Sequence, residues 1–234
     1  MRTVIAVGGG ARSGLSRRGS ARSLAALARA AFTRPLTAAA GTGHEAATPQ
    51  VPRLGILLVV FAGAVAVRVA VAGPAGAASI RAGLIFAVLL LAAGAKLCPA
   101  PRVDVRNVAI GLAGMAVLLV PVAISYGAGS LSLATDGTSY AGWAAATAVV
   151  ATAEEAFLRG ALFGALQRWR GNDVAVVGAA VAFAALHVPL YGWRAVPLDL
   201  AVGLALGTLR VLSGSWTAPA VAHVGADLLG WWLV

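Results

Sequence analysis

Residues 151–160 are Ala151-Thr152-Ala153-Glu154-Glu155-Ala156-Phe157-Leu158-Arg159-Gly160, and they place two carboxylates and a guanidinium in an otherwise apolar run. An ionised group at the centre of a bilayer costs on the order of 3 kcal/mol on insertion scales. A membrane-spanning helix that carries three such groups needs partners for them on other helices. Charges in this setting usually serve a function as well.

Composition indicates the class of protein. The chain is 60% hydrophobic and 11% charged, and its mean hydropathy is +0.88. Soluble domains contain about 45–50% apolar and about 25% charged residues. We therefore expect an integral membrane protein. The single cysteine, Cys98, excludes an internal disulfide and a cysteine-rich metal site.

From Leu54 onward the chain is a succession of hydrophobic runs close to the ~20 residues that cross a ~30 Å hydrocarbon core. Gly and Pro mark the breaks between them. The pattern predicts an all-α, polytopic transmembrane helical bundle of about seven spans, with an active-site cavity near the membrane midplane. The predicted helices are 54–72, 79–97, 107–126, 141–167, 173–190, 196–213 and 217–234.

We divide the chain into three parts. Residues 1–50 form a basic N-terminal tail that we expect to be disordered, 51–140 hold the first three transmembrane helices, and 141–234 hold four more helices. The tail is rich in Arg and poor in acids, which is also typical of an organelle transit peptide. We favour a tail that binds anionic lipid.

Lys and Arg collect in the tail and in alternate loops, which predicts a cytoplasmic N-terminus. We expect the protein in the plasma membrane of a bacterium. Its expected partners are membrane lipid and a membrane-anchored protein or peptide substrate, and no nucleic acid.

Ionisable groups in three predicted spans come out at similar depths, counted at ~1.5 Å per residue from the cytoplasmic helix ends. Glu154 and Glu155 are ~20 Å deep, His187 ~21 Å, His223 ~14 Å and Asp227 ~20 Å. Acid, imidazole and carboxylate groups from three helices therefore converge near the midplane. This convergence is the main physical indication of a site.

Spacing suggests a role for each group. Glu155 and Arg159 are four residues apart and can form an intrahelical ion pair. Glu154 is turned about 100° away and is free to face a cavity with His187, where the two can deprotonate a water. The remaining candidates are Phe183 as a wall of the pocket, and His223 with Asp227 as stabilisers of an oxyanion if their side chains donate hydrogen bonds.

Three other interpretations stay open at this point. The buried charges could form a polar brace between helices without any chemistry. Intramembrane Glu and His also serve proton or ion translocation. Two His and two carboxylates would suit a structural zinc site by ligand type.

Three motifs carry a resemblance to a known family. Glu154-Glu155-x-x-x-Arg159, Phe183-x-x-x-His187 and His223-x-x-x-Asp227 resemble, in order, the motifs of the CPBP family. These are the CAAX prenyl endopeptidase and bacteriocin-processing intramembrane proteases, also called the abortive-infection family. The motifs cover roughly residues 141–234.

The resemblance implies residue roles. Glu154 would be the general base and act with His187 on water, while Glu155 and Arg159 would support the site and Phe183 would line it. His223 and residue 227 would form the oxyanion-stabilising pair. Many relatives have Asn at that last position, so Asp227 departs from the pattern.

The resemblance also leaves the cofactor open. The family has been described as metalloproteases, so zinc is a candidate cofactor, with Glu154, His187 and His223 as candidate ligands. A metal-free glutamate mechanism is also consistent with these residues.

The function predicted from the sequence is therefore that of an intramembrane endopeptidase that hydrolyses peptide bonds of membrane-associated proteins or peptides. CAAX-type processing follows from the resemblance alone. The alternative is a non-enzymatic membrane immunity or scaffold protein, with ion or proton translocation as a third class.

Overall fold

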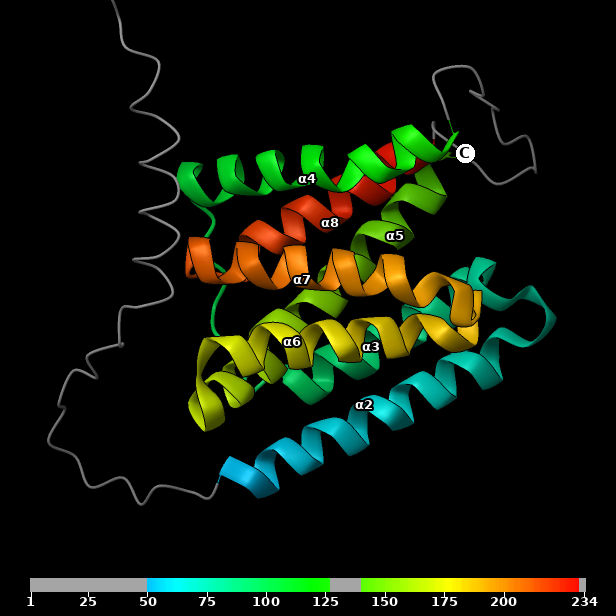
Figure 1. Ribbon diagram of the computed structural model, residues 1–234. Helices are drawn as coiled ribbons and strands as arrows, with labels where there is room; N and C mark the ends of the chain where they lie inside the picture. Colours follow the sequence, from blue (N-terminus) through cyan, green and yellow to red (C-terminus); the bar gives the residue numbers. More distant parts are fainter. Residues whose placement is uncertain (1–49, 127–139, 232–234) are drawn as a thin grey trace, which may run out of the picture. The chain divides into compact units, whose positions relative to one another are not determined.

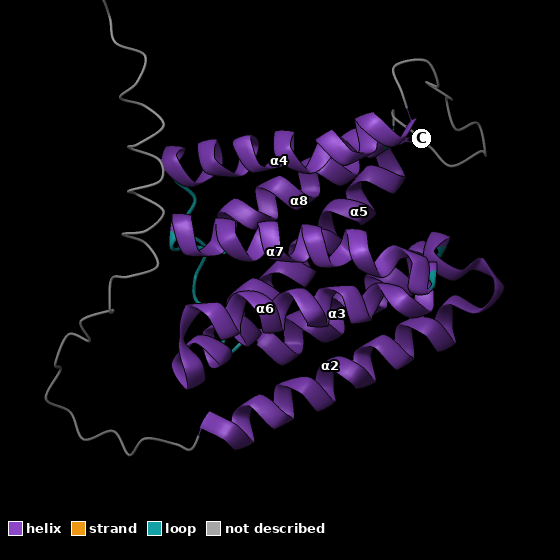
Figure 2. Ribbon diagram, in the orientation of Figure 1, coloured by secondary structure: helices purple, strands orange, loops and turns teal. Residues whose placement is uncertain are grey.

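The computed structural model describes residues 50–126 and 140–231, and all the secondary structure in these ranges is helical (Figure 1, Figure 2). The predicted all-α class is confirmed. The predicted tail, apart from Gln50, and the predicted loop from Gly127 to Gly137 lie outside the described residues. The elements are α2 Gln50–Ala72, η1 Gly73–Ala78, α3 Ile80–Gly94, α4 Val105–Tyr126, α5 Tyr140–Glu155, η2 Ala156–Leu162, α6 Phe163–Tyr191, η3 Trp193–Ala195, α7 Val196–Ser213 and α8 Thr217–Gly230.

The predicted break after residue 167 is present inside α6. Arg170 (φ −143°, ψ 15°) and Gly171 (φ 85°, ψ −174°) leave the helical conformation, so α6 consists of two helical pieces. A positive φ suits glycine because it has no Cβ. The piece after the break carries Phe183 and His187. The break therefore turns the chain back, so that the Glu154–Arg159 motif lies on the segment before it and the Phe183–His187 motif on the segment after it.

A π-helical segment, η2, follows directly on the two carboxylates that end α5. All seven of its residues are buried, including Arg159. The sequence predicts one continuous helix here. Short π-helical segments within α-helices occur frequently at functional sites.

The helices pack in pairs that bring distant segments together. α4 lies along α8 and α6 along α7, while α3 packs against both α2 and α5 (Figure 1). One apolar cluster joins α2, α3, α5, η2 and α6, with Phe86, Leu90 and Leu162 fully buried. The end of α5 is held in the middle of this cluster. Its two carboxylates therefore reach the interior.

Three segments are long and apolar enough to cross a membrane: Arg53–Ala78, Tyr140–Tyr191 and Trp193–Ser213. Ile80–Gly94 and Val105–Val120 are shorter apolar helices. Large apolar side chains are also exposed on these helices. Ile56, Val59 and Val88 are each more than 60% exposed, which suits contact with lipid tails. Long apolar helices with such surfaces belong to an integral membrane protein.

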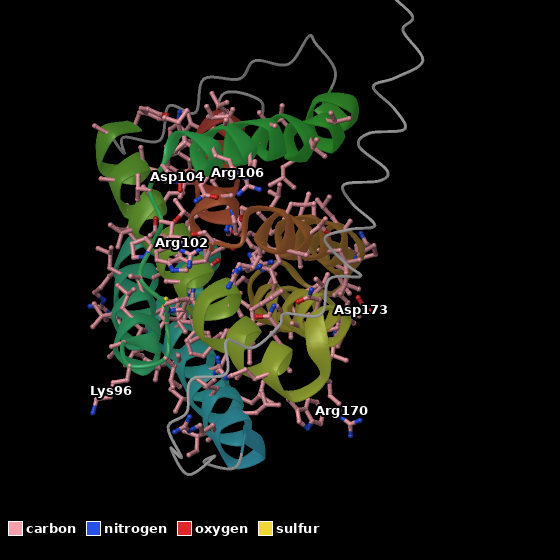
Figure 3. The ribbon with its side chains drawn as sticks, turned by 90° about the vertical axis from the view of Figure 1, so that its left-hand side faces the viewer. Lys96, Arg102, Asp104, Arg106, Arg170 and Asp173 are labelled. Atoms are coloured by element: carbon pink, nitrogen blue, oxygen red, sulfur yellow. The ribbon has the colours of Figure 1, made fainter. Side chains whose placement is uncertain are left out.

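Charged residues from separate parts of the sequence lie at one end of the bundle. Figure 3 looks at the side where the segment before α4 and the break in α6 lie, and labels the charged residues there. They are Lys96, Arg102, Asp104, Arg106, Arg170 and Asp173.

Candidate active site

Glu155 is the centre of a buried polar network. Its Oε1 lies 2.7 Å from Arg159 Nη1 and 2.9 Å from His223 Nδ1. The side chains of Glu155 and Arg159 are both fully buried, and that of His223 is 8% exposed. The ion pair predicted from the i, i+4 spacing is present. The contact with His223 ties α8 to the end of α5.

Arg159 connects this network to α7. Its Nη2 donates to the Gly203 carbonyl at 3.3 Å, and its own carbonyl accepts a hydrogen bond from Arg210 Nε at 3.0 Å. Glycine is required at 203, because a Cβ there would lie 2.8 Å from the Ala180 Cα on α6. The close approach of α6 and α7 thus places the carbonyl within reach of the guanidinium.

Phe183 lies between the two membrane histidines. Its ring centroid is 4.4 Å from that of His187 and 5.4 Å from that of His223, and the Arg159 Cζ lies 4.9 Å from the Phe183 ring centroid. Phe183 is 3% exposed. The ring predicted to wall the pocket therefore contacts both the predicted base partner, His187, and the Glu155 network.

His187 has a defined tautomer in its neutral form. Its Nδ1 lies 2.8 Å from the Phe183 carbonyl oxygen, and a carbonyl only accepts, so Nδ1 carries the proton. The lone pair of a neutral His187 is then on Nε2. Tyr191 stacks on the imidazole from one turn further on, with centroids 5.6 Å apart.

His223 and Asp227 face each other on α8. Nε2 of His223 lies 3.5 Å from Oδ2 of Asp227, as expected for two residues four apart on one helix face. The Asp227 side chain is 41% exposed, so this pair lies at the open edge of the network. Asp227 also interacts electrostatically with Glu154 and His187.

Glu154 has a partner that the motifs do not contain. Arg68 Nη1, on α2, lies 3.0 Å from Glu154 Oε1, and the two side chains are 11% and 4% exposed. The sequence already indicated that Arg68 has a partner. It is a cation inside the first predicted span, which contains no acid, and charged groups within a membrane need a partner.

Asp199 is the second residue that the motifs miss. It lies in the first turn of α7 and interacts electrostatically with His187. Its Oδ2 is buried without a hydrogen-bond partner among the described residues. Like Arg68, Asp199 could have been found in the sequence, because it is a charged residue inside a predicted span.

The predicted pairing of Glu154 with His187 is not a direct contact in the part of the chain that the structure describes. Glu154 pairs with Arg68, while His187 contacts Phe183 and Tyr191. A water held by both groups would have to bridge them, so their joint role stays a prediction.

The candidate zinc ligands do not fit a metal site. Within residues 50–126 and 140–231, no three His, Cys, Asp or Glu side chains are grouped so that they could hold a metal ion. Glu154 is engaged by Arg68, and His223 Nδ1 by Glu155.

Two cavities lie beside the network. One of about 370 Å³ is apolar, between α6 and α7, and is lined by Val181, Ala184, Ala185, Val188, Pro189, Trp193, Val196 and Leu200. Another of about 300 Å³ lies around Cys98. Neither is lined by the ionisable residues of the motifs, so the predicted active-site cavity at the midplane stays a prediction.

Fold and site together define a helical membrane protein with a buried carboxylate–guanidinium–imidazole network. Residues 136–229 match the family described as type II CAAX prenyl endopeptidase Rce1-like. The chain carries a domain of this family, the CPBP family recognised from its motifs, and all seven motif residues lie in the matched segment. The family implies a peptidase with a protein substrate. No curated protein and no solved structure matches the chain.

Proposed function

We propose that the chain is an intramembrane endopeptidase that hydrolyses a peptide bond of a membrane-associated protein or peptide. The observation that carries the proposal is the junction of three motif segments. Glu155, on α5, binds His223, on α8, and Phe183, on α6, contacts the rings of both histidines. The junction brings carboxylate and imidazole groups from three segments together, as acid–base catalysis by side chains requires.

In the proposed reaction, Glu154 is the general base. A water held between its carboxylate and Nε2 of His187 gives a proton to Glu154, and the water oxygen attacks the scissile carbonyl carbon. The Phe183 carbonyl keeps the proton of His187 on Nδ1, so that Nε2 can accept the hydrogen bond of the water.

The oxyanion needs a donor opposite the water. With both nitrogens protonated, His223 donates Nδ1–H to Glu155 and presents Nε2–H beside Asp227. This N–H would stabilise the negative oxygen of the tetrahedral intermediate. Glu154 then returns its proton to the amide nitrogen, the C–N bond breaks, and a new carboxylate and a new amine leave.

We also propose seven spans with a cytoplasmic N-terminus, in the plasma membrane of a bacterium. Packing supports the count, since α3, α4 and α8 lie against the longer helices. The basic residues at the end seen in Figure 3 support the orientation, because Lys and Arg are enriched on the cytoplasmic side. The family description supports prenylated CAAX-type substrates as the first class to test.

Product analysis by mass spectrometry tests the proposal. Purified protein in lipid is given a pool of membrane-anchored peptides, some prenylated at a C-terminal CAAX motif, beside Glu154→Gln. We expect cleavage by the wild-type protein alone, and the product masses identify the bond. Cleavage that persists in Glu154→Gln would contradict the assigned base.

The second candidate is a non-enzymatic immunity or scaffold protein. The fully buried Glu155–Arg159 pair favours it, because its contacts with His223 on α8 and the Gly203 carbonyl on α7 can brace the helices without any chemistry. Under this reading Glu154→Gln changes stability and removes no activity. Ion translocation, the third class, requires flux driven by a pH gradient across reconstituted vesicles.

A further inference from the structure

We propose that Arg68, on α2, is a positioning residue that holds the Glu154 carboxylate for the attacking water. The inference rests on the proposed function and extends it, since α2 lies outside the family match at 136–229. The catalytic unit then includes a helix that carries none of the motif residues.

The contact is specific in its geometry. Arg68 Nη1 binds Oε1 of Glu154 at 3.0 Å across 86 positions of sequence. The guanidinium also lies over the ring of Phe86, on α3, with its Cζ 4.9 Å from the centroid. One helix carries the cation, a second orients it through a cation–π contact, and a third carries the carboxylate.

Arg68 differs from the other buried arginine of the site. Arg159 ties Glu155 to the Gly203 backbone, as a structural brace would. The contacts of Arg68 in the described residues are side-chain contacts, with Glu154 and Phe86. No hydrogen bond joins the Arg68 side chain to a backbone among the described residues. Arg68 therefore positions the Glu154 carboxylate without tying it to the backbone of another helix.

The charges around Glu154 explain why it needs a cation such as Arg68. Glu154 interacts electrostatically with Asp227 and Tyr191 as well as with the cations Arg159 and His223. Arg159 and His223 are already engaged by Glu155. Arg68 supplies the direct countercharge of Glu154 among the described residues.

Binding through one oxygen leaves the other for chemistry. The ion pair uses Oε1, so Oε2 is the oxygen that takes the proton of the water. Fixing one oxygen also fixes the direction of the second. A displacement of about 1 Å can reduce a rate by about 100-fold, so this orientation matters for the rate.

The test compares Arg68→Gln and Arg68→Lys with wild type on a peptide that the wild-type protein cleaves. Arg81→Gln is the matched control, because Arg81 is an exposed arginine on α3. We expect Arg68→Gln to lower kcat by about tenfold to 100-fold with little change in KM. Arg68→Lys keeps the charge without the planar fork and should recover part of the loss.

Infrared spectroscopy gives a readout that does not need activity. The band lost in Glu154→Gln identifies the Glu154 carboxylate stretch. We expect this band to shift in Arg68→Gln and to stay in place in Arg81→Gln, at an equal folded fraction.

The outcomes separate this inference from the proposed function. Wild-type kcat in Arg68→Gln, in a protein that cleaves, overturns the role of Arg68 alone. Equal loss of folded protein in Arg68→Gln and Arg68→Lys, with kcat per folded molecule unchanged, also overturns it. Absence of cleavage by the wild type overturns the proposed function. The Glu154 band then decides whether Arg68 orients that carboxylate, and an unshifted band in Arg68→Gln overturns the inference.

Discussion

His223 Nδ1 lies 2.9 Å from Glu155 Oε1, the same oxygen that Arg159 Nη1 approaches to 2.7 Å. One carboxylate oxygen therefore joins α5, η2 and α8. Glu155 is committed to this network, which leaves Glu154 as the neighbouring acid for chemistry. Two adjacent glutamates thus have different environments, one structural and one at the proposed reacting centre.

We expect Glu155→Ala to destabilise the protein by about 3–5 kcal/mol, since it leaves the buried Arg159 charge without its partner. Glu154→Gln should cost less, because Arg68 is partly accessible and the amide keeps an acceptor oxygen. Thermal unfolding in the same lipid or detergent measures both. Equal destabilisation by the two substitutions would contradict the division of roles.

Asp227→Asn should retain cleavage, while Asp227→Ala should reduce it. An amide at 227 can donate a hydrogen bond without carrying an acidic proton, and it keeps the contact with His223 Nε2. Alanine removes both properties. Rates per folded molecule decide the matter, and full activity of Asp227→Ala would exclude residue 227 from oxyanion stabilisation.

Gly203→Ala should separate α6 from α7. The new Cβ would lie 2.8 Å from the Ala180 Cα, which belongs to backbone that cannot turn away. Overpacking of this kind costs about 1–3 kcal/mol. Gly63→Ala is the control, since nothing lies within 4 Å of a Cβ there. The control should be neutral or stabilise by up to about 1 kcal/mol, and unfolding temperatures compare the pair.

Cys98 should react slowly with a water-soluble maleimide at neutral pH. Burial raises the pKa of its thiol, and Arg210 offsets this in part. The labelling rate should therefore rise with pH around a midpoint above that of the denatured chain. Because the folded pKa exceeds the unfolded one, stability falls as pH rises between the two values.

Cys98→Ser is the control for that experiment, because Cys98 is the chain's single cysteine and the variant should take up no label. Coincident labelling midpoints for the folded and denatured chain would contradict burial of the thiol. Labelling of closed vesicles from one side would also report on which face Cys98 lies.

Much of the fold could be predicted from hydrophobic run lengths and turn residues. The break at Gly171 and the end of α7 at Ser213, where Gly214 takes a left-handed conformation, both follow from glycine in a turn. The π-helical segment after Glu155 could not be predicted. Its residues have the same apolar pattern as an α-helix, and packing decides between the two.

The contacts of the site within one helix could be predicted from the sequence, and those between helices could not. Pairs four apart on one helix, such as Glu155 with Arg159, follow from helix geometry alone. The Arg68–Glu154 pair depends on how α2 packs in three dimensions, and 86 positions of sequence carry no local signal for it. Which of two neighbouring glutamates binds His223 likewise depends on the placement of α8 relative to α5.

Leu57, Phe61, Phe86 and Phe157 pack in one cluster, which bears on how the protein can be truncated. Residues 136–229 would make a tempting minimal fragment, since they hold every motif. Such a fragment would lose the ring stacked on Phe157, that of Phe61, whose centroid lies 5.5 Å away. The smallest autonomous piece of this protein should therefore include α2, which makes it larger than the segment shared with the family.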